Sequence, residues 1–321
     1  MKNILIVGTG NLGCRHLQAL AKLNNNVKIF VLDPQPAALD RAKNSWAEVA
    51  SNAAQVTYHQ DFDFGTEIEL AVIATNSNIR SAVTKKMLDK IVVKHIVFEK
   101  FLFPELSQYT EIADLLKGKQ IKAWVNCPRR MYGVYNEIKK RLKAPVSFSV
   151  TGGAWGLACN SIHFLDLFAM LSGAVPAANR AILSDGLLAS KREGYIEFSG
   201  SVFGNTNNGD TFHINDTNQP GQPITICIAD AEKTIHVNEG ERYYIVLDAG
   251  IRDRTVEPVF FDIPYQSQLT NIFADSILET GTCALTEYGE SCRLHTQLLD
   301  IFLNQYNKII QKPDNRLCPI T

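Results

Sequence analysis

Three glycines near the start of the chain have the spacing of a phosphate-binding turn. Gly8, Gly10 and Gly13 follow the apolar run 4–7 and precede a stretch with helical spacing of apolar residues. In such a turn the first glycine permits a sharp bend, the second lets the backbone approach a pyrophosphate, and the third lets helix and strand pack closely. The start of the helix also offers free N–H groups to phosphates. We therefore expect a dinucleotide to contact Gly8, Thr9, Gly10, Asn11, Leu12 and Gly13.

An acidic residue follows at a distance that suits the same ligand. Asp33 ends the second apolar run, 27–32, and lies 20 residues after Gly13. A carboxylate at that distance can accept hydrogen bonds from the hydroxyl groups of the adenosine ribose. It would repel a 2′-phosphate, and residues 34–36 include no Arg or Lys that could receive one. We expect NAD(H) to be preferred to NADP(H). A purely structural turn is the alternative, but a strand, a helix and an acid at these distances favour the cofactor.

Polar residues end two further apolar runs. Thr75 and Asn76 follow the run 70–74, and Glu99 and Lys100 end the next one. Ligands of doubly wound sheets lie over the carboxyl ends of the strands, so Thr75 and Asn76 are candidate cofactor contacts. A lysine at such an edge can exchange a proton with a bound substrate. From the residues alone, a lysine at the end of a strand is most often solvated, and only the resemblance described below favours a functional Lys100.

A second candidate proton carrier lies on a later predicted helix, 160–171. His163 and Asp166 are three residues apart, so they share a face of that helix. The imidazole could act as a general acid–base, oriented by the carboxylate. Most neighbouring residues are apolar, so a buried structural histidine is the alternative. Trp155 lies on the preceding glycine-rich loop, where it could stack on a sugar ring or simply pack the loop.

Two adjacent arginines, Arg129 and Arg130, follow a break in the strand and helix pattern at 126–128. Either could bind a carboxylate or phosphate through two parallel hydrogen bonds. Such a group would suit an acidic sugar or a nucleotide-sugar. In an adjacent pair, however, one member usually points into solvent.

The pattern of apolar residues predicts an α/β fold with two domains. Residues 1–125 alternate strands with helices, which predicts a Rossmann domain with a doubly wound parallel sheet. The strands are expected at 4–7, 27–32, 55–58, 70–74, 95–98 and 121–125. Residues 126–321 contain many short alternating segments with turn signals between them, which predict an α+β domain with a large, mostly antiparallel sheet. We expect this domain to bind substrate and to form oligomers.

Two helices, at about 267–279 and 287–308, end the chain and could pack back on the first domain. An open face of the antiparallel sheet is of a kind usually covered, so we expect a homodimer or homotetramer.

Composition limits the partners. The chain has 321 residues, 20% of them charged, with a formal net charge of −1 and no long run of one sign. Nothing therefore indicates a nucleic acid or a membrane surface as partner. The apolar runs are shorter than the ~20 residues that span a bilayer, and the residues before Gly8 are too few for a signal peptide. The seven cysteines form no CxxC pair, so we expect reduced thiols in a cytoplasmic protein and no metal site.

Taken together, these motifs resemble the Gfo/Idh/MocA family, whose founding members include glucose–fructose oxidoreductase and inositol dehydrogenase. The resemblance covers essentially the whole chain. Residues 8–17 match the opening of the family, and 163–167 match its helix motif. Thr75 and Asn76 stand where the family often has Thr-Pro. Glu99-Lys100 stands at its Glu-Lys-Pro, with Phe101 in place of the proline.

The resemblance implies hydride transfer between a nicotinamide and a sugar, sugar derivative or related carbonyl. Lys100 and His163 would lie beside the substrate as acid–base residues, and Glu99 near the cofactor. Many catalytic members have an aspartate four residues before this histidine, where the chain has Cys159 followed by Asn160. Neither replaces a carboxylate as a proton carrier, although Asn160 can donate a hydrogen bond.

Two other functions remain open beside hydride transfer with a sugar, because Cys159 stands in place of the aspartate. One is redox-neutral chemistry with tightly held NAD⁺, as in an epimerase, lyase or glycosidase. The other is a non-catalytic NAD-binding sensor.

Overall fold

The computed structural model describes residues 1–23, 26–49, 55–250 and 256–321, and the chain divides into two compact units. Unit 1 consists of Met1–Phe103, Ser107–Pro128 and Pro264–Ser291. Unit 2 consists of Pro104–Leu106, Arg129–Ile263 and Cys292–Thr321. Each unit has its own sheet and is described separately.

Unit 1 is built on a seven-stranded sheet in the order β17-β6-β5-β4-β1-β2-β3. Its strands are β1 (Lys2–Val7), β2 (Val27–Leu32), β3 (Gln55–His59), β4 (Ile68–Ile73), β5 (Val93–Phe98), β6 (Lys122–Val125) and β17 (Thr286–Glu287). The first six strands are parallel, and β17 pairs with β6 in the antiparallel sense. Strands β1, β2 and β4 have no exposed residue and β5 has one, as expected for a parallel sheet covered on both faces.

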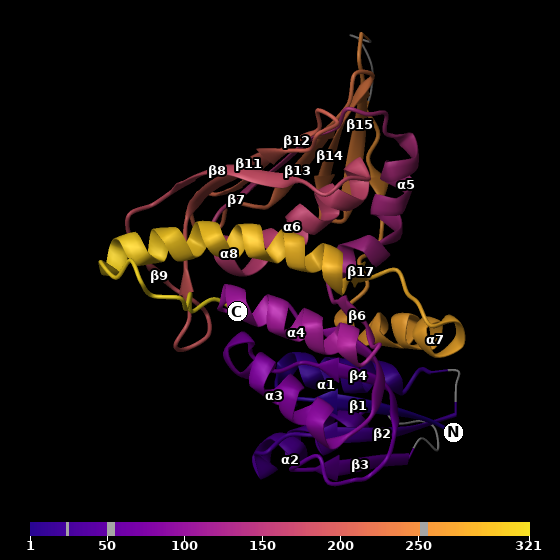
Figure 1. Ribbon diagram of the computed structural model, residues 1–321. Coiled ribbons are helices and arrows are strands. Elements are labelled where there is room, and N and C mark those ends of the chain that lie inside the picture. Colours follow the sequence, from indigo (N-terminus) through magenta and orange to yellow (C-terminus); the bar gives the residue numbers. More distant parts are fainter. Residues whose placement is uncertain (24–25, 50–54, 251–255) are drawn as a thin grey trace. The chain divides into compact units, whose positions relative to one another are not determined.

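The strand order explains which face of the sheet the helices of unit 1 cover. They are α1 (Asn11–Leu20), α2 (Pro36–Ala47), α3 (Ser77–Lys90), α4 (Leu106–Gly118) and α7 (Thr270–Thr280). Crossovers between parallel strands are right-handed, and the order reverses between β1 and β4, so α1 and α2 cover one face while α3 and α4 cover the other. Helix α7 packs against α1 and β4, although it comes from late in the chain (Figure 1).

Unit 2 is built on an eight-stranded sheet in the order β16-β15-β14-β13-β7-β12-β11-β8. Its strands are β7 (Ser147–Gly152), β8 (Ala177–Leu183), β11 (Gly200–Asn205), β12 (Thr211–Asp216), β13 (Thr225–Ala229), β14 (Lys233–Asn238), β15 (Tyr243–Asp248) and β16 (Val259–Phe260). All neighbours are antiparallel except β7 and β12. A small separate hairpin is formed by β9 (Leu188–Ala189) and β10 (Ile196–Glu197).

One face of the unit 2 sheet is covered by helices. These are α5 (Gly133–Arg141), α6 (Leu157–Ser172) and α8 (Tyr288–Ile310), and Figure 1 shows α6 and α8 on the same side of the sheet. Phe168 of α6 meets the rings of Phe148 and Phe212, which lie opposite each other on β7 and β12. The residues that alternate with the buried ones along these two strands, such as Ser149 and His213, are only half-buried. The predicted fold class is confirmed in both sheets.

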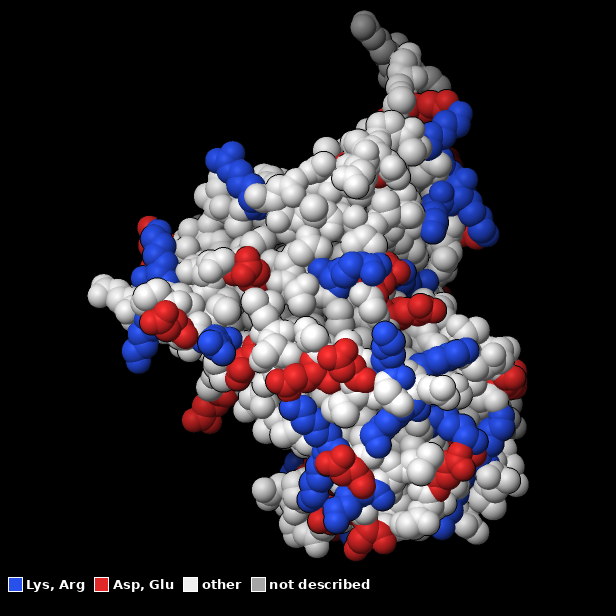
Figure 2. Space-filling model, in the orientation of Figure 1, with Lys and Arg blue, Asp and Glu red and all other residues white. Residues whose placement is uncertain are grey.

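The surface carries both signs of charge. Figure 2 shows Lys and Arg interspersed with Asp and Glu on the face that it presents. Several of these form ion pairs, among them Lys94–Glu67 at 2.7 Å and Lys86–Asp61 at 2.9 Å. No helix in the described ranges is both long enough and apolar enough to cross a membrane.

Candidate active site

The glycine turn between β1 and α1 is where a dinucleotide would bind, and the space around its three glycines shows whether one fits. Gly8 has φ +89°, and a Cβ added to Gly13 would lie 1.9 Å from the carbonyl oxygen of Gly8. The protein itself therefore requires glycine at both positions. A Cβ added to Gly10 would meet no described atom within 4 Å. Space beside Gly10 is what a pyrophosphate approaching the start of α1 would occupy, so these residues fit the cofactor.

Asp33 joins the end of β2 to this turn. Its Oδ2 accepts hydrogen bonds from the main-chain N of Thr9 at 2.8 Å and from Thr9 Oγ1 at 3.0 Å. Its Oδ1 accepts one from the main-chain N of Gln35 at 3.0 Å. These bonds fix the carboxylate beside the turn, and they direct the side chain of Thr9, which is fully buried, into the protein.

A pocket of about 420 Å³ opens at the carboxyl ends of β1, β2 and β4. The predicted cofactor residues that line it are Gly8, Gly10, Asp33, Thr75 and Asn76. Among the described residues, the buried Oγ1 of Thr75 has no hydrogen-bond partner. A buried hydroxyl without a partner is costly unless a ligand or water satisfies it.

Two cations also line this pocket, Arg41 of α2 and Lys86 of α3. Residues 34–36, which directly follow Asp33, include no such cation. Arg41 lies more than a turn into α2, so only folding brings it to the pocket, and its distance from Asp33 in the sequence gives no sign of this.

Glu99, at the end of β5, is buried with 3% of its surface exposed. Its Oε1 lies 2.8 Å from His16 Nε2 and accepts a hydrogen bond from Asn126 Nδ2 at 2.6 Å. Burial alone would raise the pKa of this carboxyl group. The hydrogen bond and charge of His16 and the hydrogen bond from Asn126 outweigh burial, so the pKa lies below its ordinary value.

These contacts continue into a closed ring of buried and partly buried hydrogen bonds. His16 Nδ1 lies 2.8 Å from Thr270 Oγ1, and Gln266 Nε2 donates to the same oxygen at 3.1 Å. Asn126 Nδ2 donates to Gln266 Oε1 at 2.9 Å, which completes the ring back to Glu99. The ring joins α1, β5, the end of β6 and the segment that leads into α7.

Lys100 directly follows Glu99 and is half-buried. Its main-chain N donates to Glu99 Oε2 at 3.3 Å. The Lys100–Phe101 peptide bond is cis. The predicted proton carrier thus lies at the carboxyl end of β5, in the same unit as the pocket that the predicted cofactor residues line, the candidate cofactor pocket.

In unit 2, two buried carboxylates hold the start of α6. Asp216 accepts hydrogen bonds from the main-chain N atoms of Ala154, Trp155 and Gly156, at 2.8 to 3.0 Å. Glu197 accepts from Ala158 N at 2.9 Å and from the next main-chain N at 3.3 Å. Carboxylates at this end satisfy the first N–H groups of the helix and its dipole. They explain why α6 begins at Leu157 rather than at the predicted residue 160.

The side chains near the start of α6 face the loop before it. Asn160 Nδ2 donates to the carbonyl oxygen of Trp155 at 2.7 Å. Trp155 Nε1 donates to Asn215 O at 3.1 Å, and its ring meets Phe164 edge to face. The thiol of Cys159 donates to the carbonyl oxygen of Thr321.

The two arginines of the break between domains pair with carboxylates of unit 2. Arg129 donates to Glu239 through Nε at 2.8 Å and Nη2 at 2.7 Å, and its guanidinium lies 4.3 Å from the centre of the Phe164 ring. Burial lowers the pKa of Arg129, but the charge and hydrogen bonds of Glu239 outweigh it and raise the pKa. Arg130 Nε donates to Asp166 Oδ2 at 2.9 Å, and Asp166 is fully buried.

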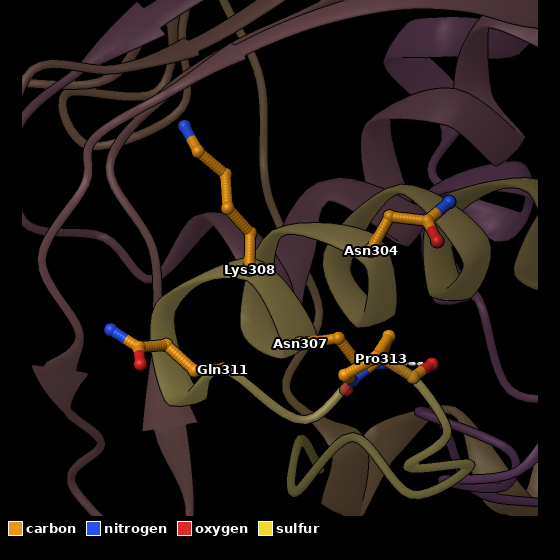
Figure 3. A pocket seen from close by; sticks show the side chains of 5 residues that line it. All are labelled: Asn304, Asn307, Lys308, Gln311 and Pro313. Atoms are coloured by element: carbon orange, nitrogen blue, oxygen red, sulfur yellow. Dashed lines mark hydrogen bonds between the residues drawn. The ribbon is translucent and has the colours of Figure 1, made fainter.

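His163 is half-buried on α6 and therefore belongs to unit 2, whereas Lys100 belongs to unit 1. Another pocket, of about 440 Å³, lies in unit 2 at the end of α8 and is lined by Asn304, Asn307, Lys308, Gln311 and Pro313 (Figure 3). It contains none of the predicted site residues.

Residues 2–127 match the model of an oxidoreductase family with an NAD-binding Rossmann fold, Gfo/Idh/MocA. The amino-terminal domain belongs to the Gfo/Idh/MocA oxidoreductase family. The chain is accordingly an NAD(P)-dependent oxidoreductase, as the sequence motifs predict. A comparison with curated protein sequences finds no match.

Solved structures share the fold of this chain over nearly its whole length. UDP-N-acetylglucosamine 3-dehydrogenase GnnA from Acidithiobacillus ferrooxidans is 15% identical with a TM-score of 0.73, covering 93% of this chain and 95% of that one. An Agrobacterium radiobacter oxidoreductase in complex with NAD⁺, L-tartaric acid and magnesium is 14% identical (TM-score 0.70; 96% and 97% covered). Biliverdin reductase from Synechocystis sp. PCC 6803, in complex with biliverdin and NADP⁺, is 14% identical (TM-score 0.71; 93% and 98% covered).

Proposed function

We propose that the protein transfers a hydride between NAD(H) and a carbinol or carbonyl carbon of a sugar, acidic sugar or nucleotide-sugar. The observation that carries the proposal is the position of Lys100 at the carboxyl end of β5, next to β4, whose carboxyl end lines the dinucleotide pocket. A bound nicotinamide accepts or donates the hydride.

The chain's own residues manage the proton. Lys100 would take the proton of the reacting hydroxyl during oxidation and return it during reduction, with His163 as the second acid–base group. General acid–base catalysis of this kind contributes roughly 10²–10⁴ in rate. Glu99 would hold Lys100 in place beside the cofactor.

The sugar class is supported by the chemistry of unit 2 and by the fold neighbour that acts on UDP-N-acetylglucosamine. Arg129, Arg130, Trp155, Asn160 and Asp166 are the proposed substrate contacts. Arg129 binds Glu239 through Nε and Nη2, so an anionic substrate would meet Nη1 on the other edge of its guanidinium group.

For the cofactor we propose a preference for NAD(H) over NADP(H). The fixed carboxylate of Asp33 would repel a 2′-phosphate. Arg41 and Lys86 line the same pocket, and their positive charges favour the 2′-phosphate of NADP(H). Thermal-shift titrations with the four nucleotides decide between them, because a ligand at about 100 times its Kd adds about 2.7 kcal/mol of stability.

We also propose that the protein is a homodimer or homotetramer that covers the helix-free face of the unit 2 sheet. Half-buried side chains form a row in register across this face: His236, Cys227, Ser149, His213 and Phe203. Light scattering coupled to gel filtration measures the mass. A monomer at micromolar concentration would contradict the proposal.

The activity test combines NAD⁺ with panels of sugars, acidic sugars and nucleotide-sugars while the absorbance of NADH is followed. Lys100→Met and His163→Ala should each reduce the rate by about 10²-fold or more. Lys94→Met is the matched control, because Lys94 lies on β5, the strand that leads to Lys100, and is exposed. Product without net NADH would favour redox-neutral chemistry. NAD⁺ binding without any product would favour the sensor.

A further inference from the structure

Arg80 is a buried cation to which the proposed mechanism gives no role. It lies on α3 with 1% of its surface exposed. Its Nη1 donates to the carbonyl oxygens of Phe101 and, at 2.8 Å, of Leu102, and its Nη2 donates to the carbonyl oxygen of Thr75. A buried charge is strongly disfavoured unless hydrogen bonds replace its water, and these three carbonyls do so.

The three carbonyl groups come from two different strand ends. Thr75 follows β4 and lines the cofactor pocket. Phe101 and Leu102 follow Lys100, at the end of β5. A single planar guanidinium, whose donors have fixed directions, therefore joins the wall of the cofactor pocket to the residues that directly follow Lys100.

Lys100 is held on its other side by Glu99, which accepts a hydrogen bond from the main-chain N of Lys100. Glu99 is in turn fixed by His16 and Asn126. The backbone on both sides of Lys100 is thus anchored by buried polar side chains, Glu99 before it and Arg80 after it.

We propose that Arg80 is a positioning residue that fixes Lys100 with respect to the cofactor pocket. This inference rests on the proposed function, in which Lys100 is an acid–base residue. Reacting groups must be held in a near-attack geometry, and a displacement of about 1 Å costs on the order of 10²-fold in rate. A lysine is a point donor on a flexible stem, so Arg80→Lys cannot reproduce the three bonds.

The test compares Arg80→Met and Arg80→Lys with Lys85→Met, a control on the same helix whose ammonium group is exposed and pairs with Glu111. Circular dichroism and thermal unfolding establish that each variant is folded at the assay temperature. The first readout is the rate at which an amine-acylating reagent labels Lys100 relative to exposed lysines, measured by mass spectrometry. The second is the Kd of NADH from its fluorescence, and the third is kcat and KM.

In folded Arg80→Met we expect the relative labelling of Lys100 to change at least about threefold and kcat to fall by about 10–10²-fold, more than KM changes. In Arg80→Lys both the relative labelling of Lys100 and kcat should lie between the values of this variant and wild type. In Lys85→Met both should match wild type. A folded Arg80→Met with wild-type labelling and kcat would overturn the proposal, as would a loss of activity proportional to the unfolded fraction.

The labelling readout needs no turnover. If Lys100→Met keeps the wild-type rate, the proposed function fails, whereas labelling still decides whether Arg80 positions Lys100.

Discussion

The imidazole of His16 and the carboxylate of Glu99 are 2.8 Å apart, and both groups are buried. The contact joins the helix that begins at the dinucleotide turn to the strand that ends at Lys100. The elements proposed to bind cofactor and to move the proton are therefore connected inside one unit by a hydrogen-bonded pair.

This pair predicts a pH dependence of stability. Glu99 has a pKa below its ordinary value of 4.5, so its ionised form stabilises the fold above that pH, and the contribution is lost as the pH falls towards the lowered pKa. Wild type should thus lose free energy of unfolding relative to Glu99→Gln when the pH drops below about 4.5. Urea unfolding at several pH values measures the difference. The control is Glu279→Gln on the exposed end of α7, and equal pH profiles for wild type and Glu99→Gln would contradict the prediction.

Thr75→Val tests the pocket through its buried hydroxyl. The substitution removes an oxygen that has no partner among the described residues, so stability should stay the same or rise. If the cofactor satisfies this hydroxyl, the Kd of NADH should rise about threefold to tenfold, as expected for one hydrogen bond. Thr57→Val on β3, outside the pocket-lining residues, is the control. Unchanged NADH affinity would mean that Thr75 does not contact the cofactor.

Asp33→Asn tests cofactor selection. The amide oxygen can still accept from Thr9, but the negative charge that repels a 2′-phosphate is gone, and Arg41 and Lys86 line the pocket. The ratio of the NADPH Kd to the NADH Kd should fall by about tenfold, equivalent to about 1.4 kcal/mol. Fluorescence titration with both nucleotides measures it. Asp33→Ala, which also removes the bonds to Thr9, should in addition weaken both ligands, and a constant ratio in both variants would exclude Asp33 as the selecting residue.

Cys159→Asp introduces the aspartate that the family resemblance implies at this position, yet we expect it to harm this protein. The thiol donates to the carbonyl oxygen of Thr321, and Glu197 accepts from the main-chain N of Cys159. A carboxylate there would face a carbonyl oxygen and a second carboxylate, which should cost about 1–3 kcal/mol in unfolding free energy. Cys159→Ser can still donate and should unfold close to wild type in urea. A stable and more active Cys159→Asp would show that the site accepts the family's aspartate.

The sequence was most informative where the signals are local. The glycine turn, Asp33 and the polar residues at strand ends lie within short segments, and the structure places five of the predicted cofactor residues around one pocket. The fold class, which is confirmed, was predicted from the spacing of apolar residues, and several strands of each sheet carry this signal.

The residues that hold these groups in place could not be found in this way. His16 and Thr270 are 254 positions apart, and Asp216 is 60 or more positions from the loop that it binds. Nothing near Arg80 in the sequence distinguishes it from an exposed arginine, and only the folded structure shows that it is buried. Such partners are selected by the tertiary structure, and no spacing rule in one sequence identifies them.

Gly10 has a consequence for how this chain can change over time. Because a Cβ there meets no described protein atom, folding does not require glycine at that position. A lineage that stopped using the nucleotide could replace Gly10 at little risk to its structure, while Gly8 and Gly13 would still be retained by packing. Of the three glycines, Gly10 is therefore the one that ligand binding requires and the fold does not.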